Sequence, residues 1–289
     1  MEDSTQKQIT RKQHIVPQSY LKLFATETKP DHFMIGVGEY RNSKFNFYKN
    51  SISNVGYIEY YYEVNQRSVN FWENRFAKEI EPYCSNYLPD LLLRIQEAQN
   101  HETVLSLDDK IRLGNYLCAQ SLRVPAWIDN AGQEISKRTI KNFKSYALSH
   151  IPPYYSDKGR REYCMAIFRS NPTDDDIKDI MLLSLMDSPK KQERIDALLA
   201  KTWIVYSVPE FPYFFTSDNP VKRSFRNGDN GLKDSNSEIF FPLSPSILLR
   251  IVSPTRLNGV TRFDNSKISF ASSNDALDFV LYCNSFQKI

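Results

Sequence analysis

The stretch "TWIVYSV", residues 202–208, marks the point where the hydrophobic pattern of the chain changes its period. Just before it, the pair Ser188-Pro189 is typical of a helix start and predicts a helix that continues through Leu199. From it onward, short apolar runs are separated by Pro, Asn, Gly and Ser, which predicts strands. These runs are "TWIVYSV", "YFFTS", "IFFPL", "ILLRIV" and "KISFA". The last part of the chain is therefore expected to be strand-rich, closed by a helix over "NDALDFVLYCNSF".

The region before this change divides into a strand-forming part and a longer helical part. Residues 32–50 alternate about a turn, and residues 52–64 are rich in Tyr, Ile and Val, so both predict strands. From Ser68 to Ala98 the pattern is helical, interrupted by two prolines that restart or kink it. Two further helices are expected after capping-box pairs. These pairs are Ser106 with Asp109, and Thr173 with Asp176.

This order predicts an α+β fold, with a mainly helical middle layer packed on short antiparallel strands from the N- and C-terminal parts. We expect residues 1–12 to be disordered and residues 13–289 to form a single α+β domain. Within that domain the helical layer covers about residues 66–200, and the strand-rich part covers about 201–289.

Composition limits the class of protein. The chain has 289 residues, of which 41% are hydrophobic and 25% charged, values typical of a globular protein. A formal charge of only +3 does not by itself indicate a nucleic-acid partner. The four cysteines are far apart, which fits reduced thiols, and no run of about 18 apolar residues indicates a membrane span. We therefore expect a soluble cytoplasmic protein without a membrane partner.

Several polar residues fall where the pattern predicts core. On the helix from Ser68, Glu73 shares a face with apolar residues, and an unpaired charge there would cost several kcal/mol. On the helix from Ser106, Gln120 continues the apolar stripe, and Arg123 follows just before Pro125. A guanidinium at a helix end can reach a carboxylate or a phosphate. Glu73 with Arg123 can equally be a structural ion pair, and Gln120 can serve main-chain groups.

Two further candidates lie near the ends of the chain. Asp218 and Asn219 follow an apolar run in "FFTSDNPV", and His14 and Gln18 lie in "QHIVPQSYLKLFA". A side chain at a strand end is held by a rigid element, which suits binding and catalysis. The alternative for Asp218 is an Asx turn before Pro220, and for His14 an ordinary hydrogen-bonded histidine.

The same positions carry a family resemblance. The stretches "HIVPQSYLKLFA", "AQSLRVPAW", "FFTSDNPV" and "FPLSPSILL" occur in this order, and the chain resembles the mainly bacterial family named domain of unknown function 4238. The resemblance covers about residues 12–286. It implies recurrent polar positions at the seven residues named above, although the helix around Glu73 matches loosely, and it implies no activity. These positions are His14, Gln18, Glu73, Gln120, Arg123, Asp218 and Asn219.

Three functions compete for this set of residues. The first is a metal-dependent, nuclease-like hydrolase of a bacterial toxin or phage-defence type acting on nucleic acid. In it His14, Glu73 and Asp218 would be both the catalytic groups and the ligands of Mg²⁺ or Mn²⁺. The substrate would be bound by polar side chains from the other segments. These are Gln18, Gln120, Arg123 and Asn219.

The second function uses the same residues without a metal, to bind or hydrolyse a nucleotide or another phosphate-bearing small molecule, with His14 as general acid or base. The third is a non-catalytic interaction module, whose buried polar network specifies the fold and whose Tyr and Phe residues serve a partner surface. The sequence does not identify a protein partner for it.

Overall fold

The structure, a computed structural model, describes residues 8–41, 44–98, 104–125, 128, 149, 156–169, 173–187, 190–207, 214–224, 232 and 237–254. Its N-terminal part contains β1 (Lys12–His14), α1 (Gln18–Leu21), β2 (Thr26–Lys29), β3 (His32–Arg41), β4 (Lys44–Ser51) and β5 (Tyr57–Glu59), with the 3₁₀ turns η1 (Lys22–Phe24) and η2 (Ile52–Asn54). Its helices are α2 (Phe71–Glu79), the π-helical turn η3 (Tyr83–Tyr87), α3 (Leu88–Glu97), α4 (Leu107–Leu122), α7 (Asp157–Arg169), α8 (Asp174–Met186) and α9 (Lys190–Leu199). Its last strands are β6 (Thr202–Ser207), β7 (Lys222–Ser224), β8 (Glu238–Ser244) and β9 (Ile247–Val252). The fold class is α+β, as the sequence predicted.

Local sequence signals account for the starts of the main helices. Ser106 accepts a hydrogen bond from the N–H of Asp109 while the Asp109 side chain bonds back to Ser106, which forms the capping box at the start of α4. Thr173 and Asp176 do the same for α8. The predicted helix after Ser68 is divided at Pro82, because a proline removes one main-chain donor and crowds the preceding turn.

The strands form three separate antiparallel sheets. β1 pairs with β5, and β2, β3 and β4 form a three-stranded sheet in that order. The third sheet has the strand order β6-β9-β8-β7. β8 and β9 form a hairpin at its centre, and β6, the first of these strands in the sequence, pairs with β9 at one edge. Every residue of β9 is buried, which is why "ILLRIV" reads as a continuous apolar run around the single Arg250.

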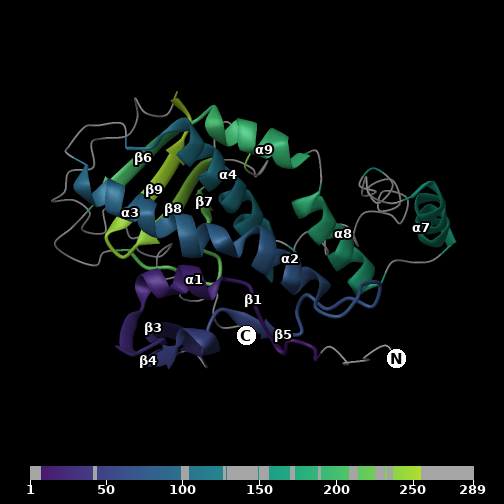
Figure 1. The fold of residues 1–289 in the computed structure, drawn as a ribbon, viewed down its shortest axis with the longest axis horizontal. Helices are drawn as coiled ribbons and strands as arrows, with labels where there is room; N and C mark the ends of the chain where they lie inside the picture. Colours follow the sequence, from purple (N-terminus) through teal and green to yellow (C-terminus); the bar gives the residue numbers. More distant parts are fainter. Residues whose placement is uncertain are drawn as a thin grey trace, which may run out of the picture.

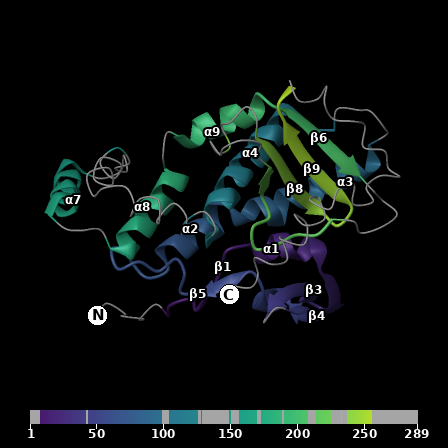
Figure 2. The same cartoon turned by 180° about the vertical axis from the view of Figure 1, so that it is seen from behind.

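One hydrophobic core takes residues from the N-terminal, helical and C-terminal parts. Tyr20 of α1 stacks on Phe241 of β8 with ring centroids 5.2 Å apart, and Tyr116 of α4 lies 5.8 Å from the same ring. The Tyr20 hydroxyl also donates to the carbonyl of Pro242 at 2.7 Å. Figures 1 and 2 show the C-terminal sheet against the helices, with α1 and the N-terminal strands along one side and α7 standing apart.

Helix α8 is fastened to α2 by two arginine–aspartate pairs, which we name the α2–α8 clasp. Arg67, just before α2, donates two hydrogen bonds from Nε and one from Nη2 to Asp179, and Trp72 Nε1 donates to Asp179 at 2.9 Å. Arg75 of α2 binds Asp187 with two hydrogen bonds of 2.8 and 2.9 Å. Each carboxylate oxygen of this clasp therefore accepts at least one donor.

Some predicted elements differ from those observed. Residues 8–12 belong to the folded structure, because Thr10 donates to Asn70 at 2.8 Å and Asn70 donates to the carbonyl of Gln8. Residues 214–217 of the predicted strand "YFFTS" form no strand, although the main-chain N–H of Phe214 donates to the carbonyl of Pro245 at 2.9 Å. The next strand along the chain is β7. The predictions for "KISFA", for the final helix and for residues 1–7 lie outside the described residues.

No helix in the described part of the chain is long and apolar enough to cross a lipid bilayer.

Candidate functional site

Arg123 lies at the carboxyl end of α4 and is fully buried. Its Nη2 donates to the main-chain carbonyl of His14, and its Nε donates to the Tyr62 hydroxyl at 3.3 Å. The Tyr62 hydroxyl in turn donates to the carbonyl of Arg123 at 3.1 Å. The guanidinium carbon lies 4.4 Å from the ring centroid of Phe76, so an aromatic face shields one side of the charge. Nη1 has no partner among the described residues.

Two amide side chains hold the N-terminal segment against this arginine. Gln120, one turn earlier on α4, donates to the carbonyl of Ile15 at 2.9 Å. Gln13 accepts from the main-chain N–H of Tyr62 at 2.5 Å and donates to Glu63 at 2.6 Å. These bonds satisfy main-chain groups that a short strand would otherwise leave buried and unpaired. Gln120 therefore serves a main-chain group through its amide nitrogen, which is the structural role considered for it from the sequence. Its Oε1 has no partner in the described part of the chain.

His14 is 7% exposed and lies next to this guanidinium. Burial and the charge of Arg123 lower the pKa of His14 to about 4, against a smaller opposing effect of a hydrogen bond to the main chain of Ile52. The ring is therefore neutral at pH 7. Its Nε2 is buried and has no partner among the described residues, so its lone pair is available as a base or ligand.

Glu73 of α2 is half-buried and faces the same arginine. Burial raises the pKa of Glu73 to about 7; the charge of Arg123 lowers it, and the carboxylates of Glu81 and Glu63 raise it. Its Oε2 is buried without a partner in the described part of the chain. No ion pair within 4 Å joins Glu73 to Arg123 among the described residues, so a closed salt bridge does not account for this pair.

Asp218 and Asn219 directly follow residues 214–217, which form no strand. Asp218 is 8% exposed, and burial raises its pKa to about 7, partly offset by hydrogen bonds with its own main chain and that of Asn219. Two residues earlier, the Thr216 hydroxyl lies 3.0 Å from that of Tyr20 of α1. The segment is thus seated beside α1, as Figures 1 and 2 show, but none of Arg123, His14 and Glu73 is among the causes of the shift.

The structure does not gather the predicted metal ligands His14, Glu73 and Asp218. Among the described residues no group of three or more His, Cys, Asp and Glu side chains is placed to hold a metal ion. The charge of Arg123 acts on the pKa of both His14 and Glu73, whereas none of these three residues contributes to the pKa shift of Asp218. Gln18 begins α1 and is half-buried, and no hydrogen bond of its side chain to these residues is present in the described part of the chain. The donor set therefore does not fit the metal site that the sequence predicted.

We name His14, Glu73, Gln120 and Arg123 together with Tyr62 the Arg123 cluster. Tyr62 could not be predicted from the sequence, because a run of three tyrosines gives no period that distinguishes the buried one. Gln13 was not predicted either, because it stands beside His14 but does not lie on an apolar helical stripe.

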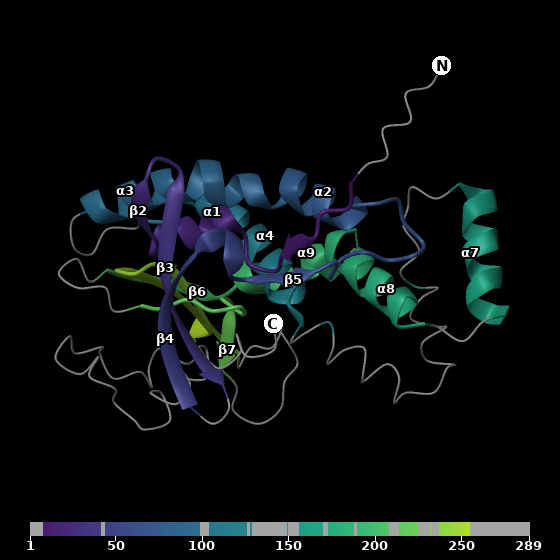
Figure 3. The same ribbon diagram turned by 90° about the horizontal axis from the view of Figure 1, so that it is seen from below.

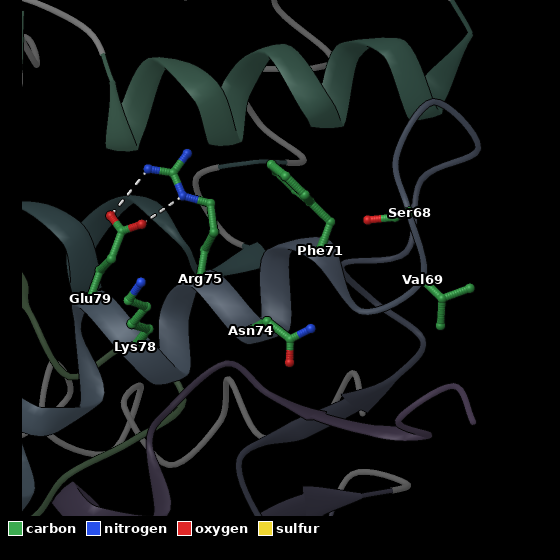
Figure 4. A pocket seen from close by; sticks show the side chains of 7 residues that line it. All are labelled: Ser68, Val69, Phe71, Asn74, Arg75, Lys78 and Glu79. Atoms are coloured by element: carbon green, nitrogen blue, oxygen red, sulfur yellow. Dashed lines mark hydrogen bonds and ion pairs between the residues drawn. The ribbon is translucent and has the colours of Figure 1, made fainter. Parts of the chain in front are cut away.

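A surface pocket lies on the other side of α2. Its volume is about 320 Å³, and Figure 4 shows the residues that line it. They are Ser68, Val69, Phe71, Asn74, Arg75, Lys78 and Glu79. Glu73 is not among them, because residues two positions apart on a helix point to nearly opposite sides. The pocket is therefore separate from the Arg123 cluster.

The sequence profile of the family described as "Protein of unknown function (DUF4238)" matches residues 12–276. The chain belongs to this family. The match covers the Arg123 cluster and the segment of Asp218, and the resemblance expected from the sequence motifs is confirmed. No curated protein and no solved structure matches the chain.

Proposed function

We propose that this DUF4238 protein is a hydrolase of phosphate-bearing substrates, nucleotides or nucleic acid, with His14 and Glu73 as its acid–base pair. The proposal rests on one observation: each of these two side chains has a buried polar atom without a hydrogen-bond partner among the described residues. His14 Nε2 and Glu73 Oε2 are both buried without a partner among the described residues, beside a fully buried arginine. Side chains kept only for structure usually have their buried polar atoms paired.

The displaced pKa values assign the two roles. With a pKa near 4, His14 is neutral at pH 7 and can accept the proton of an attacking water at Nε2. With a pKa near 7, Glu73 keeps a proton on a substantial fraction of molecules and can donate it to the leaving oxygen. Water would add to phosphorus as the bond to the leaving oxygen breaks, so one proton is taken up and one is delivered.

Arg123 acts as a positioning residue in this proposal. Its Nη2 holds the carbonyl of His14, and its charge favours the neutral form of His14 and the charged form of Glu73. The unpaired Nη1 would be the donor nearest to a bound phosphate oxygen. Because the donor set does not fit the predicted Mg²⁺ or Mn²⁺ site, we derive no step through a metal ion.

The test is turnover of a panel of substrates by purified protein: labelled single- and double-stranded DNA, RNA, ATP, GTP and NAD, each with Mg²⁺, with Mn²⁺ and with EDTA. We expect at least one to be hydrolysed, and His14→Gln and Glu73→Gln each to reduce the rate by roughly 10²- to 10⁴-fold. The matched controls are His32→Gln and Glu79→Gln, at an exposed histidine and at a second glutamate of α2. They should keep the wild-type rate.

The pH dependence of the rate adds a second readout. The rate should fall below about pH 4, where His14 is protonated, and above about pH 7, where Glu73 loses its proton. Turnover of no substrate in the panel, or turnover that both cluster variants retain, would contradict the proposal.

A specific observation also favours the non-catalytic interaction module. The side-chain N–H groups of Gln120 and Arg123 donate to main-chain carbonyls of the N-terminal segment, as expected of a network that specifies the fold. Under that function His14→Gln and Glu73→Gln would both lower stability and change no rate.

We further propose a cytoplasmic location and a role of the bacterial toxin or phage-defence type. The location is supported by Cys84, Cys118 and Cys164, which are free thiols, as is usual in a reducing compartment. The biological role is consistent with a hydrolase of nucleotides or nucleic acid.

A further inference from the structure

The hairpin formed by β3 and β4 exposes aromatic side chains on one face. Phe47 is 79% exposed and Phe45 is 36% exposed, although both belong to a regular eight-residue strand. Their ring centroids lie 4.5 Å apart in a T-shaped arrangement. Figure 3 shows these two strands as a long pair that extends away from the helices. Large exposed rings on a strand are a liability for aggregation, so their presence needs an explanation.

The other face of the same hairpin is the one that packs on the protein. Val37 of β3 is 6% exposed and belongs to the hydrophobic core, and Ile35 packs against that core. Side chains alternate along a strand, so Phe45 and Phe47 share the outward face with Lys49. The aromatic face is therefore directed away from the core.

Gly38 allows the two rings to lie across the neighbouring strand. It pairs with Phe47 in the antiparallel register, and a Cβ added to it would lie 2.8 Å from Cζ of Phe45 and 3.4 Å from Cε1 of Phe47. Covering of a strand glycine by an aromatic ring is a known stabilising arrangement, and it accounts for Phe45. It does not account for Phe47, most of whose surface remains in contact with solvent.

A positive charge lies beside these rings. Lys49 is on the same outward face of β4, two residues after Phe47, and Lys44 begins the same strand just before Phe45. Lys44 and Lys49 are exposed, and neither forms an ion pair within the described ranges of the chain. Flat aromatic faces with flanking lysines are what single-stranded nucleic acid requires, because bases stack on the rings and phosphates attract the ammonium groups.

We propose that the outward face of the β3–β4 hairpin binds single-stranded nucleic acid, with one base stacked on Phe47 and the backbone running past Lys49. This binding surface is independent of the Arg123 cluster and does not require that the protein hydrolyse anything. A duplex offers no open base faces to Phe47, so the site should prefer single strands.

The test is fluorescence anisotropy of labelled 12-nucleotide single-stranded DNA and RNA, titrated with the full chain in the Glu73→Gln background so that any cleavage of the probe is slow. We expect Phe47→Ala to weaken binding on the order of 10-fold, and Phe47→Tyr to retain it. Lys49→Gln should weaken binding and reduce its salt dependence. Phe215→Ala is the matched control, because Phe215 is 58% exposed outside the hairpin and its removal should change nothing.

Three results would overturn the proposal. One is undetectable binding at low salt with the probe and up to about 100 µM protein. Another is equal binding of duplex and single-stranded probes. Equally effective competition by polyphosphate would count in the same way, because either result would show that the face binds phosphate by charge and not by base stacking. The third is concentration-dependent self-association of the chain that Phe47→Ala abolishes without any oligonucleotide binding, which would assign the face to a second copy of this chain.

The two proposals fail separately. Absence of hydrolysis by the wild type, with oligonucleotide binding intact, would contradict the acid–base pair alone. Intact binding in Phe47→Ala would contradict the hairpin face alone. Folding of each variant is checked by circular dichroism and by its urea midpoint.

Discussion

Two arginine-centred clusters contact helix α2, and they differ in how completely their polar atoms are paired. In the α2–α8 clasp, Arg67 and Arg75 hold Asp179 and Asp187 with two or more hydrogen bonds each. In the Arg123 cluster, the buried guanidinium bonds to a carbonyl and a hydroxyl. The nearby carboxylate of Glu73 is left without a close cation.

The difference separates a structural from a candidate functional use of the same residue types. A closed pair repays the cost of burying its charges through hydrogen bonds and Coulomb attraction. In the Arg123 cluster the cost of burying ionisable groups is not offset in this way, and the pKa values of His14 and Glu73 are displaced as a result. Natural proteins retain such unfavourable groups mainly where function requires them. The following predictions test whether the two clusters differ in this way.

The largest effect is expected when Arg123 is replaced by Met. The change removes the buried donor of the His14 carbonyl and the donor to the Tyr62 hydroxyl, so the free energy of unfolding should fall by about 3 to 5 kcal/mol. Urea unfolding followed by circular dichroism measures it. Arg112→Met is the control, because Arg112 is exposed and its ion pair with Asp108, one turn away, lies at the surface. A similar small effect for both variants would show that the buried network contributes little.

Asp179→Asn should have the next largest effect. Asp179 accepts hydrogen bonds from Arg67 and Trp72, and an amide in its place removes the charge and offers one acceptor atom in place of two. We expect the free energy of unfolding to fall by about 2 to 4 kcal/mol in the same urea assay. Asp175→Asn, at an exposed aspartate-rich helix start of α8 that bonds to Asn65, should cost much less. An unchanged free energy of unfolding in Asp179→Asn would show that the α2–α8 clasp is not a stabilising structural pair, and the two clusters would then not differ as proposed.

A smaller effect is predicted for His14 and depends on pH. The folded-state pKa of about 4 lies below the unfolded value of 6.5, so between these values the unfolded chain binds more protons. Stability contributed by neutral His14 is therefore present above pH 6.5 and lost as the pH falls toward 4. Relative to His14→Gln, the wild type should lose on the order of 1 to 3 kcal/mol over this window.

The difference between the two proteins is the quantity to measure, because Glu73 and Asp218 titrate in the opposite sense over part of the same range. Urea unfolding of both proteins at pH 7.5, 6 and 4.5 gives it. A difference that stays constant with pH would place His14 in contact with solvent.

Much of the Arg123 cluster could be predicted from the sequence. Helical periodicity placed Glu73, Gln120 and Arg123 on inward faces, and the structure buries Gln120 and Arg123 fully and Glu73 in part. Periodicity gives the direction of a side chain but not its partner. It could not show that Arg123 would bind the carbonyl of His14 in preference to a carboxylate, because that contact depends on how a distant segment packs.

The part that failed depended on long-range placement as well. Asp218 was expected at the end of a strand, but residues 214–217 form no strand in the described structure. Their position is set by contacts such as that of Thr216 with Tyr20, nearly 200 residues away in sequence. The catalytic roles of His14, Glu73 and Asp218 stay predictions.

The most direct test of an open, functional cluster is the stability of Glu73→Gln compared with wild type at pH 8 and pH 5. The folded-state pKa of about 7 lies above the unfolded value of 4.5, so stability is lost as the pH rises from 4.5 to 7. The account predicts that Glu73→Gln, which cannot carry this charge, is more stable than wild type at pH 8, and that the gain shrinks at pH 5. A variant that is less stable than wild type at pH 8, to the extent expected for Asp179→Asn, would contradict it and make Glu73 a structural partner of Arg123.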